Sequence, residues 1–240
     1  MSDQVKLGIN RTGAQMSPHD TAHQQEATRL NPADVPGDIS DYSQERERAI
    51  RHADLVGSVP VPGSIKGMIK VTFDEALGKR PEVLLDKLGE RLAFERTGVR
   101  LYEAMVVKAA AAAGADPALV QTLRHIQAQE LEHMNIVREA IETLGGDPTS
   151  MTPCADVAAV KAQGVLQVLT DPRTTVSQSM SAILTIELED NAAWELLIEL
   201  TQKGGHPLIA KRFRHAHEQE EQHVVTVREL IRQDLFEQLS

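Results

Sequence analysis

The sequence predicts an all-α protein: a four-helix bundle of two antiparallel helical hairpins joined by a long crossover, with an irregular N-terminal extension. Three observations support this fold class. Aromatic residues make up only 3% of the 240 residues, while residues with high helix propensity are plentiful. After residue 80, Pro and Gly recur at intervals where they can begin and end helices. Between these breaks, apolar residues recur three and four positions apart, as on one face of a helix.

The N-terminal part differs from the rest because Pro and Gly are scattered through residues 1–80. Brief helical patterns occur there only around 41–55 and 68–78. We therefore expect a largely irregular extension with short helices over 1–80, followed by the bundle over 81–238.

The first hairpin is delimited by residues that favour helix ends. Pro81 can open a helix because its missing N–H is among the groups that remain unbonded at a helix start, and Gly114 can close that helix. The next helix is predicted to begin at Asp116 and Pro117, where Asp can cap free N–H groups, and to end at Gly145. The short link between the two helices predicts an antiparallel pair.

The second hairpin follows the same logic. One helix is expected just after Asp171 and Pro172 and ends at Gly204, and the last opens at Pro207 and runs nearly to the end of the chain. Each of the four helices would be about 45 Å long at 1.5 Å per residue. The connection over 145–172 is long enough to cross the bundle, and its segment ADVAAVKAQGVLQVL can add a short helix.

Polar residues interrupt the apolar stripe near the middle of every predicted long helix. An unpaired carboxylate in a core costs several kcal/mol, and converging carboxylates repel, so a core that contains them must neutralise or coordinate them, and metal cations do both. Glu-x-x-His places both side chains on one helix face, and the motif occurs once in each hairpin. The interrupting residues are Glu95 in the first helix, Glu130 and His133 in the second, Glu187 in the third, and Glu220 and His223 in the fourth.

Two further acidic residues lie near Glu187. Glu189 is about 200° around the helix from it and therefore off the stripe, so we favour Glu187 as the core carboxylate. Asp190 lies on the stripe one turn along. It can either accept a hydrogen bond from a metal-binding His or cap a polar end of the cavity, and the sequence leaves both interpretations open.

The set resembles the ferritin-like dinuclear carboxylate proteins, bacterioferritin and rubrerythrin above all, over residues 81–236. The resemblance implies a pair of metal ions, with Glu130 and Glu220 bridging, Glu95 and Glu187 terminal, and His133 and His223 each binding one ion. Tyr102 follows Glu95 by seven residues, which is similar to the segment of both relatives in which a phenol lies beside the site. This similarity implies a catalytic role for Tyr102. Trp194 follows Glu187 at the same spacing and is interpreted as a core aromatic residue.

Four carboxylates and two imidazoles suit iron or manganese better than zinc or calcium. We expect two Fe ions, with Mn as the alternative, and an oxidoreductase that reacts with O2 or hydrogen peroxide. Cys154 is the only cysteine, so no four-cysteine iron–sulfur relay exists and an external electron donor is required. A manganese catalase is a variant of this hypothesis.

Two rival functions remain. One is a ferroxidase that stores iron in a cage, which we rank lower because little chain follows the fourth helix. The other is a ferritin-like scaffold or partner-binding stress protein, against which the retention of all six ligands argues. The sequence identifies no organic substrate.

Charge and hydropathy limit the classes of binding partner and the compartment that the sequence favours. The net charge is -10 and no dense Lys/Arg cluster occurs, so neither nucleic acid nor an anionic membrane surface is expected to bind. Lys108 interrupts the one long Ala/Val run, and the first ten residues lack the apolar core of a secretory signal. We therefore expect a cytoplasmic protein, and a homo-oligomer in which the extension contacts a neighbouring subunit.

Overall fold

The computed structural model describes residues 8–9, 12–34, 39–61 and 80–239, and its regular secondary structure there is entirely helical. Contacts divide the chain into two units, with the boundary at residue 55. In the described ranges, no helix combines the length and the apolar character that crossing a membrane requires.

The unit before residue 56 contains two short helices, α1 (Pro18–Leu30) and α2 (Ser40–His52), and a 3-10 turn at Ala14–Met16. Neither helix has a buried residue. Helix α2 matches the pattern around 41–55, whereas the predicted pattern at 68–78 lies outside the described residues.

Helix α1 is a departure from the irregular segment that the sequence predicts. It has no apolar stripe, so periodicity does not reveal it. Pro18 occupies its first turn, and Arg29 near its end donates hydrogen bonds of 2.9 and 2.7 Å to Glu26. Such local pairs contribute only about 0.2–0.5 kcal/mol each.

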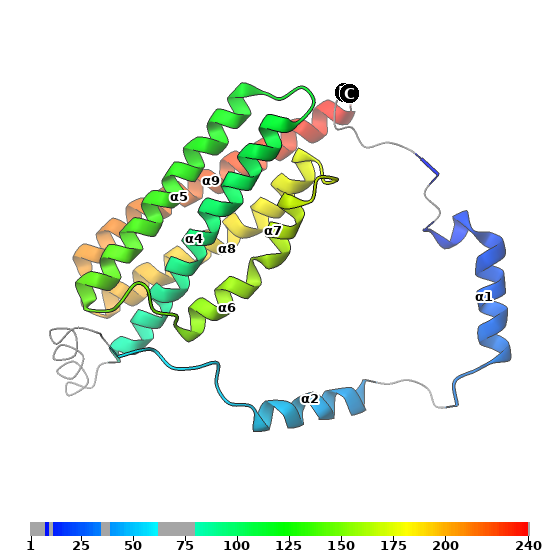
Figure 1. The fold of residues 1–240 in the computed structure, drawn as a ribbon, viewed down its shortest axis with the longest axis horizontal. Helices are drawn as coiled ribbons and strands as arrows, with labels where there is room; N and C mark the ends of the chain where they lie inside the picture. Colours follow the sequence, from blue (N-terminus) through cyan, green and yellow to red (C-terminus); the bar gives the residue numbers. More distant parts are fainter. Residues whose placement is uncertain (1–7, 10–11, 35–38, 62–79, 240) are drawn as a thin grey trace. The chain divides into compact units, whose positions relative to one another are not determined.

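Four long helices form the second unit: α4 (Pro81–Ala111), α5 (Pro117–Leu144), α8 (Val176–Lys203) and α9 (Pro207–Leu239). They pack side by side, α4 against α5 and α8 against α9, with further contacts from α4 to α8 and from α5 to α9 (Figure 1). Because short links join α4 to α5 and α8 to α9, each of these pairs is antiparallel.

Local capping explains where these helices begin and end. The Asp116 carboxylate accepts a hydrogen bond of 2.9 Å from the backbone N–H of Ala118 at the start of α5. Gly145 ends α5 with a φ of 89°, a left-handed conformation that glycine adopts without strain. Thr175 and Gln178 form a capping box, so α8 begins at residue 176, a few residues after the predicted position.

The crossover contains two helices, α6 (Pro153–Lys161) and α7 (Gln163–Thr170), where the sequence indicates one. Both pack along α4 (Figure 1). Helix α4 therefore has a second buried stripe, which a bundle with one apolar seam per helix does not predict. This stripe includes Phe94, Leu101 and Met105, which belong to one apolar cluster with Ala162 and Leu169 of the crossover.

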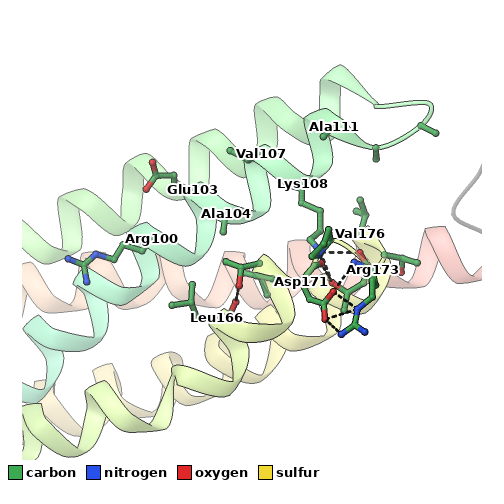
Figure 2. Close-up of a pocket in the computed structure, with 17 residues that line it drawn as sticks. Arg100, Glu103, Ala104, Val107, Lys108, Ala111, Leu166, Asp171, Arg173 and Val176 are labelled. Carbon is green, nitrogen blue, oxygen red and sulfur yellow. Dashed lines mark hydrogen bonds and ion pairs between the residues drawn. The ribbon is translucent and has the colours of Figure 1, made fainter.

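Lys108 ties the end of the crossover to α4. Its ammonium group donates hydrogen bonds to the carbonyl oxygens of Asp171 (2.8 Å) and Thr174 (3.0 Å) and to the Thr174 hydroxyl. Figure 2 shows Lys108 and Asp171 at one end of a surface pocket that α4 and α7 flank, and Thr174 also lines this pocket. Because α8 begins directly after this turn, the anchor helps to set the register of α8 against α4.

Two apolar clusters fill the space between the long helices, one toward each end. The first contains Leu88, Trp194 and Phe213, and the second contains Ile183 and Val227. The polar residues that interrupt the stripes lie between them along the helices. The clusters therefore enclose a polar layer that water does not reach.

Candidate metal centre

The six polar residues of the predicted stripes come together in this layer. Each is at most 2% exposed. On α8, Glu187 faces the cluster, whereas Glu189 is half-buried and pairs with Lys161 of α6. The six are Glu95 from α4, Glu130 and His133 from α5, Glu187 from α8, and Glu220 and His223 from α9.

The ligand atoms fall into three overlapping groups, within each of which they lie within 4.8 Å of one another. Glu220 belongs to all three groups. Its Oε1 is 2.6 Å from Nδ1 of His133, and its Oε2 is 3.1 Å from Nδ1 of His223. One carboxylate therefore reaches both imidazoles. The first group is Glu95, His133 and Glu220, the second is Glu130, Glu187, Glu220 and His223, and the third is Glu95, Glu130, Asp190 and Glu220.

Many of these buried atoms are without a hydrogen-bond partner in the described part of the chain. They include both oxygens of Glu95, Oε1 of Glu130 and Oε2 of Glu187. An unsatisfied buried polar group costs about 1–3 kcal/mol, and more when it is charged. Cations would satisfy these lone pairs, and four carboxylates balance two divalent ions. The donor set therefore fits a pair of metal ions.

The electrostatics of the cluster without cations are unfavourable. Burial, and then the charges of neighbouring carboxylates, raise the pKa values of Glu95, Glu130 and Glu187 well above the usual value. Glu220 behaves differently. Burial opposes its ionisation, but the two histidines outweigh burial and hold its pKa at about 2.

Tyr102 lies beside the cluster, with its hydroxyl donating a hydrogen bond to Oε1 of Glu187. It is 1% exposed, and burial, together with the charge of Glu187, raises the pKa of the phenol well above its usual value. The phenol is therefore protonated. Trp194 packs edge-on against His133, with ring centroids 5.8 Å apart, and is a fully buried core residue.

Asp190 contacts Arg91 of α4, and neither histidine of the cluster hydrogen-bonds to it. The Arg91 guanidinium is 3% exposed, and its Nε lies 3.4 Å from Oε1 of Glu95. Of the two roles that the sequence left open, Asp190 therefore does not orient a histidine. Arg91 was not among the predicted site residues, although its position four residues before Glu95 places both on one helix face.

The outer nitrogens of the two histidines contact glutamines from the opposite hairpin. Nε2 of His133 is 2.8 Å from Oε1 of Gln219, and Nε2 of His223 is 3.0 Å from Oε1 of Gln129. Sequence reasoning missed both glutamines. The signal was the repeated Gln-Glu-x-x-His, which extends each Glu-x-x-His motif by one residue.

Gly98 is also part of the site because its lack of a side chain leaves space for the Glu130 carboxylate. A Cβ atom at this position would lie 3.2 Å from the carboxyl carbon of Glu130 and closer still to its Oε2. A glycine inside a long helix costs about 0.5–1 kcal/mol relative to alanine. Its position three residues after Glu95 was the sequence signal for this close approach.

Comparison with known proteins gives no match to any family model, curated protein or solved structure.

Proposed function

We propose that the second unit is a ferritin-like four-helix bundle that binds two iron ions and acts as an oxidoreductase on O2 or hydrogen peroxide. One observation carries the proposal. Four glutamates and two histidines from four helices are buried in one layer, with several of their lone pairs facing no hydrogen-bond donor. Such a cluster is costly to keep unless cations occupy it.

The contacts favour a particular division of the ligands. Glu220 would bridge, because its two oxygens face two different imidazoles. Glu130 is also a candidate bridge, since its oxygen lies 3.3 Å from Nδ1 of His223 and it groups with Glu95 as well. The remaining ligands would divide into two pairs, one for each ion: Glu95 with His133, and Glu187 with His223. Manganese is compatible with the same donors.

Two ferrous ions would supply the two electrons that, with two protons, convert hydrogen peroxide into two water molecules. An external donor must then return those electrons. Tyr102 supports this reaction because it holds a proton at its hydroxyl, hydrogen-bonded to Glu187, in a layer that the apolar clusters shield from water. Arg91 orients the outer side of Glu95.

The test is an anaerobic Fe(II) titration followed by separate exposure to O2 and to hydrogen peroxide, monitored optically. We expect saturation at two irons per chain and rapid peroxide consumption. The Glu130→Ala variant should lose both, whereas Glu132→Gln, an exposed glutamate on the same helix, should retain both.

Other outcomes would replace the proposal. Iron uptake far beyond two per chain, with a large shell on sizing, would establish storage. Oxygen release from peroxide by the Mn-loaded but not the Fe-loaded protein would establish a manganese catalase. Absence of metal binding by the wild-type chain would refute the proposal altogether.

A further inference from the structure

Each histidine of the cluster has one ring nitrogen that faces carboxylates and another that faces a glutamine. The Nδ1 atoms face the carboxylates: Nδ1 of His133 is 2.6 Å from Glu220, and Nδ1 of His223 lies within 3.6 Å of three glutamates. The Nε2 atoms point the other way, toward the amide oxygens of Gln219 and Gln129.

This arrangement selects one tautomer of the imidazole. An amide oxygen only accepts hydrogen bonds, so the ring nitrogen that faces it must carry the proton. In a neutral ring the other nitrogen then has a free lone pair. That lone pair belongs to Nδ1, which faces the carboxylates, as binding a cation requires.

The two contacts are reciprocal across the hairpins. Gln219 directly precedes Glu220 and serves His133 of the first hairpin, while Gln129 directly precedes Glu130 and serves His223 of the second. The segments 124–133 and 214–223 share the pattern Arg-His-x-x-x-Gln-Glu-x-x-His. Both glutamines are half-buried.

We propose that Gln129 and Gln219 are positioning residues that fix the ring orientation and the Nε2–H tautomer of the metal-binding histidine on the opposite hairpin. The inference rests on the proposed metal binding. A neutral amide performs this role without adding another negative charge to a layer that already holds five buried carboxylates, namely the four glutamates and Asp190. Outer contacts of this kind orient the metal-bound ring and tune its basicity.

The experiment uses the full chain with 15N-labelled histidine and Zn(II) as a diamagnetic probe. Long-range 1H–15N spectra identify which ring nitrogen carries the proton, and competition with a chromophoric chelator measures the affinity. In the wild type, we expect two zinc ions and two rings with metal-bound Nδ1 and protonated Nε2. The variants are Gln129→Leu and Gln219→Leu, with the exposed Gln121→Leu and Gln222→Leu as matched controls on the same helices.

Each leucine substitution should affect the histidine of the opposite hairpin. Gln219→Leu should alter the resonances of His133, and Gln129→Leu those of His223, each with a loss of zinc affinity of about 10- to 100-fold. The controls should bind zinc like the wild type. Gln219→Glu and Gln129→Glu keep an acceptor oxygen and should keep the Nε2–H tautomer.

Several results would overturn the inference. Wild-type spectra with zinc on Nε2 would do so without any variant, even if the leucine variants fail to fold. So would unchanged affinity and spectra in both leucine variants, which would leave the metal-binding proposal intact. If the wild type binds no zinc and no iron, the proposed function and the inference fail together.

Discussion

Removal of metal from the cluster should make the folded chain lose stability as the pH rises. Burial raises the pKa values of Glu95, Glu130 and Glu187 well above their usual value of 4.5, so the metal-free folded chain holds protons that the unfolded chain releases. Stability falls with pH wherever the folded state binds more protons. Stability therefore falls over the pH range that begins at the pKa of these carboxyls in the unfolded chain and ends at their raised pKa values in the folded chain. His133, whose pKa is raised mainly by Glu220 against the effect of burial, adds to the fall above 6.5.

The magnitude follows from the number of protons. Each proton held only by the folded state contributes about 1.4 kcal/mol per pH unit, so the three glutamates together give at most about 4 kcal/mol per pH unit. Asp190 adds one more such proton, because burial raises its pKa to about 8. Total stabilities are about 5–15 kcal/mol, so a few pH units suffice to weaken the metal-free fold severely. Metal at a concentration of about 100 times its Kd stabilises the folded chain by about 2.7 kcal/mol for each of two positions. For a unit of this size, that corresponds to about 10–20 °C in Tm.

The assay is thermal unfolding, followed by helical circular dichroism from about pH 5 to about pH 8, with chelator or with excess Mn(II). We expect Tm to fall with pH in chelator and to fall much less with Mn(II), which replaces the protons. Glu130→Gln should reduce the slope in chelator by about 1.4 kcal/mol per pH unit, whereas the exposed Glu132→Gln should not. A chelated Tm that stays constant or rises with pH would refute the reasoning.

Three other substitutions probe the site and its support. Gly98→Ala should displace the Glu130 carboxylate and weaken metal binding in a titration, while changing metal-free stability by no more than about 1 kcal/mol. Gly164→Ala is the control: no atom lies near its Cβ, so metal binding should be unchanged. Tyr102→Phe should retain two metal ions but slow peroxide consumption about 100-fold in stopped-flow kinetics, because its proton donor is lost. Lys108→Met should lower stability by about 1–3 kcal/mol in urea unfolding, with unchanged metal stoichiometry, because the turn before α8 loses its donor.

The sequence by itself predicted the all-helical class and the ends of the long helices, because those ends depend on local chemistry. Asp116 caps α5 and Gly145 terminates it, as their residue types indicate. Periodicity also identified the inward face of each helix, and the six polar residues on those faces are the ones that the structure buries together. Helix α1 escaped prediction because it has no buried face from which periodicity could arise.

Tertiary structure alone decided which residues meet across the helices. Periodicity says which side chains point inward, but not the relative height and rotation of the helices, and these determine every contact between α4 and α8 or between the hairpins. Pairing of Arg91 with Asp190, the exchange of Gln129 and Gln219 between hairpins, and the space that Gly98 leaves all depend on that alignment. The same holds for the second buried face of α4, to which the packing of α6 and α7 contributes.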